Sequence, residues 1–86
     1  MANYKIVFKR SVAKDLRPIP AKDIQRILAR IDQLAEDPRP LGAERLTNED
    51  KYRIRQGRYR ILYTIADEIV TVTVVRVGHR RDIYRS

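Results

Sequence analysis

The chain has 86 residues and no cysteine, and its 19 lysine and arginine residues outnumber 11 acidic ones to give a net charge of +8. This length predicts a single domain, residues 1–86, and the lack of cysteine excludes a disulfide framework and a thiolate metal site. The charge favours nucleic acid or an acidic protein as partner. Because the sequence has no stretch of ~20 apolar residues, we expect a cytoplasmic protein with no membrane partner.

The N-terminal half predicts one strand followed by two helices. Residues 4–8, YKIVF, are β-prone, and residues 11–17 predict a short helix that Ser11 is placed to cap. A longer helix is expected to start at Pro20, because its apolar residues recur at helical spacing. These residues are Ile24, Ile27, Leu28, Ile31, Leu34 and Ala35. We expect this stripe to pack in the core and assign it no chemistry.

The C-terminal half predicts three strands. Residues 41–50 are expected to form a loop, and residues 51–63, KYRIRQGRYRILY, alternate basic and apolar side chains as a half-buried hairpin does. After a turn at residues 66–68, the β-branched run 69–77 predicts a central strand that Gly78 ends. The expected fold is α+β: an N-terminal strand, a two-helix hairpin and a three-stranded antiparallel meander, with the helices packed on one face of the sheet.

Basic residues gather in the predicted hairpin. If Gln56-Gly57 is its loop, Arg55 lies opposite Arg58 and Arg53 opposite Arg60, so that four guanidinium groups share one face. Opposed like charges destabilise a sheet, so these cations call for an external anion, and the planar arginine fork suits phosphate. We therefore interpret this face as a site for an RNA backbone, with Arg53 and Arg58 positioning phosphates.

One basic residue of the last strand has two possible orientations. With a two-residue loop at Asp67-Glu68, Arg76 faces away from Arg60, whereas a three-residue loop places it on the same face. The sequence leaves both registers open.

Few catalytic chemistries fit the remaining residues. The chain has no phosphate-binding Gly-rich loop, serine elbow or cysteine nucleophile, and its single histidine and scattered acids predict no metal and no cofactor. RNA supplies its own nucleophile, the 2′-OH, whose attack on phosphorus needs a proton acceptor, a proton donor and stabilising cations. Arginine supplies only the cations. His79 is the reserve acid or base, because its ordinary pKa lies near neutrality.

The run YRIRQGRYRILY, followed by VVRVGHRRDIY, resembles the RelE family of toxins from type II toxin–antitoxin modules, and the likeness covers essentially the whole chain. The resemblance implies a ribosome-dependent endoribonuclease that cleaves mRNA in the A site, inhibits translation, contacts mRNA and ribosomal RNA, and is neutralised by a cognate RelB-like antitoxin. By motif position it implies that Arg55, Arg60 and Arg80 bind the scissile phosphate and that Tyr84 stacks on a nucleotide or joins the proton transfer. Further RNA contacts are expected from Lys51, Arg53, Arg58, Arg81 and Arg85.

The chain departs from the family pattern at Arg53 and Arg55, where studied members often carry lysine. Because arginine keeps its proton, a general-base role at Arg55 is disfavoured. Two other functions remain open. One is that of the ParE-type toxins, which share the fold, bind and inhibit DNA gyrase, and generally lack so many basic residues. The other is a non-catalytic RNA-binding module.

Overall fold

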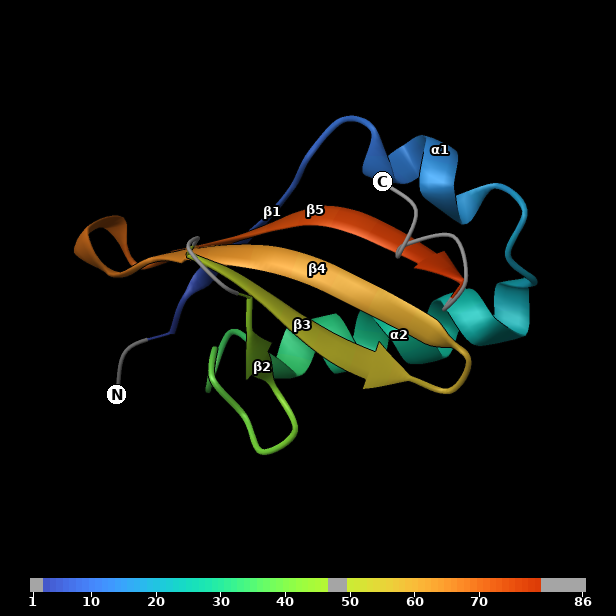
Figure 1. Ribbon diagram of the computed structural model, residues 1–86. Coiled ribbons are helices and arrows are strands. Elements are labelled where there is room, and N and C mark those ends of the chain that lie inside the picture. The colour runs from blue at the N-terminus through green and yellow to red at the C-terminus, as the bar shows by residue number, and fades with distance from the viewer. Residues whose placement is uncertain (1–2, 47–49, 80–86) are drawn as a thin grey trace.

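The structure is a computed structural model that describes residues 3–46 and 50–79. Those residues form a five-stranded sheet in the order β1-β5-β4-β3-β2 (Figure 1). Its strands are β1 (Lys5–Phe8), β2 (Glu44–Arg45), β3 (Lys51–Gln56), β4 (Tyr59–Ala66) and β5 (Thr71–His79). β1 runs parallel to β5, and every other neighbouring pair is antiparallel. The predicted α+β fold is confirmed, with β2 as an additional strand inside the expected loop.

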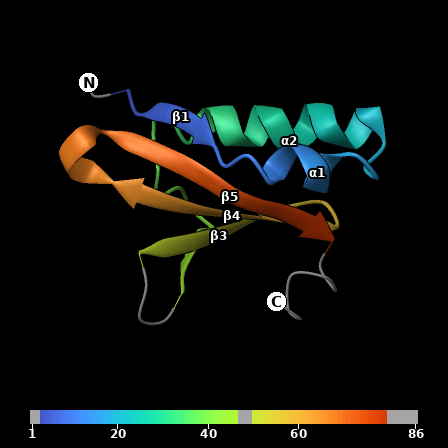
Figure 2. The same cartoon turned by 90° about the horizontal axis from the view of Figure 1, so that it is seen from above.

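Two helices, α1 (Val12–Leu16) and α2 (Ala21–Gln33), lie on the same side of the sheet (Figure 2). The α2 helix begins directly after Pro20, whose carbonyl accepts hydrogen bonds from the N–H groups of Asp23 and Ile24 at 2.9 and 3.0 Å. Ile27, Ile31 and Leu34 of its predicted stripe pack into a core with apolar residues of β3, β4 and β5, and Ile24 lies against that core. Leu28 is exposed, so its expected place in the core was wrong. No helix within residues 3–46 and 50–79 is both long and apolar enough to cross a membrane.

The hairpin between β3 and β4 turns one residue later than predicted. Its loop is Gly57-Arg58, so Gln56 pairs with Tyr59 and Arg55 pairs with Arg60. Gly57 has φ +61° and Arg58 lacks a positive φ, which is typical of a type II′ turn with glycine at its first position. The expected pairs Arg55–Arg58 and Arg53–Arg60 were therefore wrong.

A β-bulge in β5 decides which way Arg76 faces. Leu62 pairs with Arg76 but Tyr63 pairs with Val74, so Val75 is an extra residue in β5. The bulge shifts the alternation, so that Val74 and Val77 both point into the core while Arg76 lies on the opposite side of the sheet. Arg76 therefore lies on the same side as Arg60, the orientation expected for a three-residue loop. The loop itself has four residues, 67–70, so both predicted loop lengths were wrong and the bulge sets the orientation.

The β5 strand also continues past the residue expected to end it. Gly78 pairs with Arg60 and His79 with Tyr59, so the strand keeps its ladder to His79. Next to the bulge, the backbone N–H of Val77 donates to the Asp15 carboxylate of α1 at 3.1 Å. This bond fastens α1 to the end of β5.

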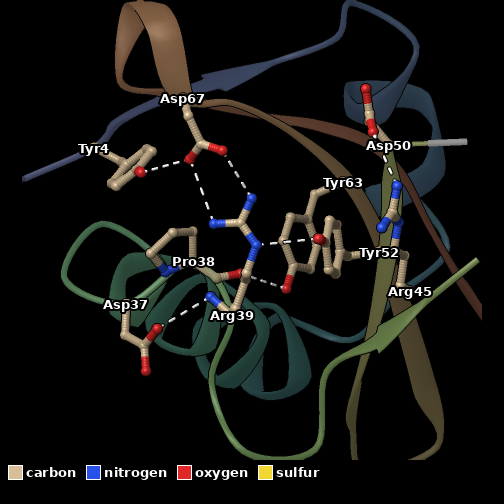
Figure 3. A network of polar contacts seen from close by, with 9 residues as sticks. All are labelled: Tyr4, Asp37, Pro38, Arg39, Arg45, Asp50, Tyr52, Tyr63 and Asp67. Carbon is tan, nitrogen blue, oxygen red and sulfur yellow. Dashed lines mark hydrogen bonds and ion pairs between the residues drawn. The ribbon is translucent and has the colours of Figure 1, made fainter.

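A polar network around Arg39 holds the segment between α2 and β2 (Figure 3). The Arg39 guanidinium forms an ion pair with Asp67, Nη2 to Oδ2 2.9 Å, and its Nε donates to the Tyr52 hydroxyl at 3.0 Å. Asp67 also accepts from the Tyr4 hydroxyl at 2.7 Å. The network thereby joins this segment to the β4–β5 turn and to the residue before β1.

The buried Tyr63 adds a second attachment for the same segment. Its hydroxyl donates to the backbone carbonyl of Pro38 at 2.8 Å, and its ring stacks on Tyr52 with centroids 5.7 Å apart. Burial raises the pKa of Tyr63 to about 12, so the phenol keeps its proton at neutral pH. The path of the chain into β2 is thus fixed at two consecutive residues, Pro38 and Arg39.

Candidate functional site

Basic side chains line the side of the sheet opposite the helices. The register assigns five residues to this side, and we call them the arginine face: Lys51, Arg53 and Arg55 of β3, Arg60 of β4 and Arg76 of β5. Arg55 lies directly opposite Arg60, and Leu62 separates Arg53 from Arg76. Three strands therefore present cations on one surface, as the alternation in the hairpin had predicted for β3 and β4.

Burial differs sharply between the opposed arginines. Arg60 retains 2% of its accessible surface, whereas Arg55 is exposed. A charge with few water molecules around it is screened less, so Arg60 acts more strongly on a nearby anion than a surface cation does. Arg55 remains reachable for direct contact with a phosphate, and the pair combines a fixed charge with an accessible one.

A carboxylate also lies on the arginine face. Glu44 of β2 pairs with Arg53 of β3, and directly paired residues point to the same side of a sheet. The Arg53 guanidinium donates to the Glu44 carboxylate in an ion pair. The hydrogen bond and charge of Arg53, followed by the charges of Arg55 and Arg60, lower the pKa of Glu44. Glu44 is therefore ionised at neutral pH and lies within the field of three arginines.

His79 lies away from the arginine face. His79 pairs with Tyr59, which lies on the same side of β4 as the core residue Ile61, two positions further along the strand. The His79 ring meets the Tyr59 ring edge-on, with centroids 6.0 Å apart. His79 also lines a hollow of about 380 Å³ between α1 and the end of β5. The structure thus does not bring this expected acid or base together with Arg55 and Arg60.

The other expected site residues divide into two groups. Arg58 is exposed in the β3–β4 turn rather than on a strand, so it lies at the end of the arginine face. The positions expected to complete the site lie outside the described residues: Arg80, Arg81, Tyr84 and Arg85.

The side chains of this surface have the chemistry to attract an anion. Within the described ranges, no three His, Cys, Asp or Glu side chains form a group able to hold a metal ion. Arginines bind phosphate through their charge and their forked N–H groups, and they stabilise negative charge that develops on its oxygens. Glu44 is the described carboxylate in contact with the face.

Sequence reasoning missed Glu44. It was placed in a loop, and a two-residue edge strand has too few residues to produce an alternating pattern. The available signal was the acid itself, in GAERL just before a strongly basic hairpin, because cross-strand pairs often combine opposite charges.

Comparison with known proteins places these features in context. Residues 6–84 match a protein family described as the ParE toxin of type II toxin–antitoxin system, parDE. The chain is 33% identical over 84 residues to Toxin RelG of Mycobacterium tuberculosis. The aligned stretch covers 95% of this chain and 97% of RelG.

Two solved structures are similar over nearly their whole length. An arginine-to-alanine double mutant of E. coli toxin RelE in the free state gives a TM-score of 0.80 at 25% identity, covering 99% of this chain and 93% of the other. The archaeal RelE–RelB complex from Pyrococcus horikoshii gives a TM-score of 0.78 at 25% identity, and the match covers 91% of this chain and 96% of the other.

Proposed function

The chain belongs to the ParE toxin family of type II toxin–antitoxin systems, within the RelE/ParE superfamily, and from its arginine face we propose that it is a ribosome-dependent endoribonuclease. In this proposal it cleaves mRNA in the ribosomal A site and so inhibits translation. The predicted family is confirmed, and the activity is the finer step that the proposal adds.

The observation that carries the proposal is the opposed pair Arg55 and Arg60 on the arginine face. Directly opposed like charges weaken a sheet, and this pair is flanked by Arg53 and Arg76. Such an arrangement has a functional reason if a phosphate binds at the exposed Arg55, where the buried Arg60 adds its charge. A face that only needed solubility could distribute its charges without opposing them.

The proposed reaction uses the RNA as its own nucleophile. The 2′ oxygen attacks the adjacent phosphorus and loses its proton, and the bond from phosphorus to the 5′ oxygen breaks as that oxygen gains a proton. The products are a 2′,3′-cyclic phosphate and a 5′-hydroxyl end. Arg55 and Arg60 stabilise the additional negative charge on the phosphate oxygens in the transition state.

Arg80 and Tyr84 enter this mechanism through the family resemblance alone. In the proposal Arg80 adds a third cation to the scissile phosphate, and Tyr84 stacks on a nucleotide or takes part in proton transfer. Because arginines keep their protons, the acid and the base must come from other groups, from the RNA or from the ribosome. This need supports dependence on the ribosome, since orientation of the 2′-OH alone contributes several kcal/mol.

A RelB-like antitoxin is the proposed neutralising partner. The similar Pyrococcus horikoshii structure is a RelE–RelB complex, and the match extends over 91% of this chain. A net charge of +8 favours an acidic or amphipathic segment as the bound partner.

A second candidate is inhibition of DNA gyrase by binding, as in the ParE type. The description of the matching family, which names the ParE toxin, favours this candidate. The arginine face supports the ribonuclease instead, because a face built for phosphate suits RNA directly.

The two candidates separate in a reconstituted system. Purified chain is added to ribosomes programmed with a defined mRNA, and the 5′ ends are mapped by primer extension. The proposal predicts cuts at fixed positions within A-site codons and little cleavage of the same mRNA without ribosomes. Intact mRNA, together with gyrase-linked DNA breaks in a parallel gyrase reaction, would support the ParE type instead.

A further inference from the structure

Glu44 has a position that the proposed reaction does not explain. It is a negative charge beside the five cations of the arginine face, directly opposite Arg53 and within the field of Arg55 and Arg60. A polyanion approaching the arginine face meets this carboxylate where a phosphate would otherwise bind. Its presence must lower the attraction of the face for RNA.

The two partners of the ion pair are held very differently. The Glu44 side chain keeps 56% of its surface exposed, whereas that of Arg53 keeps 18%. Arg53 therefore has a fixed place in the face, while Glu44 can move into water without leaving a buried site. Because the Glu44 end of the pair is open to water, a competing anion can approach the Arg53 guanidinium from that side.

The free protein gains from such a carboxylate. The opposed Arg55 and Arg60 repel each other, and a nearby anion reduces the net charge that the face accumulates. A bound RNA phosphate supplies the same negative charge, so the carboxylate is needed only while RNA is absent.

We propose that Glu44 is a resident counter-anion of the arginine face, which an RNA phosphate displaces from Arg53, and that it sets the affinity of the face for RNA. This inference rests on the proposed function, since it assumes that the face binds an RNA backbone. The Arg39 and Tyr63 attachments hold the segment that leads into β2, so they keep the carboxylate in place.

The test compares two variants of equal net charge. Glu44→Gln removes the carboxylate from the face, and Glu68→Gln removes an exposed carboxylate in η1 (Asp67–Ile69), at the other end of β4 from Arg60. The probe is a fluorescein-labelled single-stranded RNA methylated at every 2′-OH, so that it binds without being cleaved. Affinity is measured by fluorescence anisotropy on the full chain.

We expect Glu44→Gln to bind the probe about fivefold more tightly than the wild type, and Glu68→Gln to match the wild type. The plot of log affinity against log salt should be steeper for Glu44→Gln by about 0.7, because one more cation becomes available to phosphate. In an Arg53→Gln background, the gain from Glu44→Gln should shrink, since the displaced partner is already absent.

Equal affinities for the two glutamine variants, or weaker binding by Glu44→Gln, would overturn the inference. Because the probe lacks a free 2′-OH, these results do not depend on cleavage. A chain that binds the probe as expected but never cuts ribosomal mRNA would refute the proposed function while leaving the role of Glu44 intact.

Discussion

Arg55 of β3 and Arg60 of β4 lie directly opposite each other, and only Arg55 is exposed. Cross-strand neighbours of like charge destabilise a sheet, whereas a phosphate bound at the exposed Arg55 guanidinium also lies in the field of the buried Arg60. The pair therefore costs stability in the free protein and favours the complex. This opposition leads to a prediction in which stability and activity change in opposite directions.

Replacing Arg55 by threonine removes the repulsion and places a good strand former on β3. We expect the free energy of unfolding to rise by roughly 0.2–1 kcal/mol, while ribosome-dependent cleavage falls by about 10²–10³-fold. Urea denaturation and single-turnover cleavage measure the two effects. Arg45→Thr is the matched control, because Arg45 is an exposed arginine of β2 on the other side of the sheet from the arginine face, and it should keep the activity. A similar loss in both variants would contradict the pairing argument.

Gly57 opens the hairpin turn with φ +61°, and no described residue beyond its two chain neighbours has a heavy atom within 4 Å of where its Cβ would be. Gly57→Ala should therefore destabilise through backbone strain alone, by about 1–2 kcal/mol. Gly57→Asn should cost less, because asparagine tolerates a positive φ better. Urea midpoints of the three proteins provide the measurement, and an alanine variant as stable as the wild type would exclude this turn geometry.

Tyr63 is buried and donates a hydrogen bond to the Pro38 carbonyl. Tyr63→Phe keeps the ring but leaves that carbonyl without its donor, so the free energy of unfolding should fall by about 1–2 kcal/mol. Thermal unfolding followed by circular dichroism measures this loss. Tyr52→Phe provides the comparison, because the hydroxyl of the partly exposed Tyr52 accepts a hydrogen bond from Arg39. Its free energy of unfolding should fall by less than that of Tyr63→Phe.

Asp67 makes stability depend on pH in the acid range. The hydrogen bond from Arg39, and then that from Tyr4, lower the pKa of Asp67 in the folded protein. A carboxyl group with a depressed folded pKa contributes stability above its unfolded pKa of about 3.9 and loses it as pH falls through the folded value. Asp67→Asn should therefore destabilise the protein at pH 7 and have a smaller effect at pH 3.

Urea unfolding at the two pH values measures this difference, with Glu68→Gln as the control. That variant removes an acid from the same exposed turn and should have little effect at either pH. An Asp67→Asn effect of equal size at pH 3 and pH 7 would show that the Arg39 pair is not responsible.

The sequence predicted the parts of the fold that periodicity controls. Ile27 and Ile31 recur at helical spacing and are buried in α2, and the alternation of β3 placed Arg53 and Arg55 on one face. The hairpin register was missed because glycine fits a two-residue turn at either position, depending on turn type. A shift of one residue changed every predicted arginine pair.

The remaining features depend on contacts between distant segments. Val74 and Val75 are both apolar and β-branched, so the run gives no sign of which residue forms the bulge. Glu44 lies on the arginine face because β2 pairs with β3, and the chain that leads into β2 is held at Pro38 and Arg39. The pairing of Arg39 with Asp67 joins residues 28 positions apart, which no local pattern predicts.

The most direct test of the central claim maps mRNA 5′ ends across the transcriptome after brief, tightly controlled expression of the chain. The account predicts codon-phased cuts within translated regions for the wild type and for Arg45→Thr, and their loss in Arg55→Thr. Growth inhibition with intact mRNA and trapped gyrase–DNA breaks, unchanged by Arg55→Thr, would contradict it.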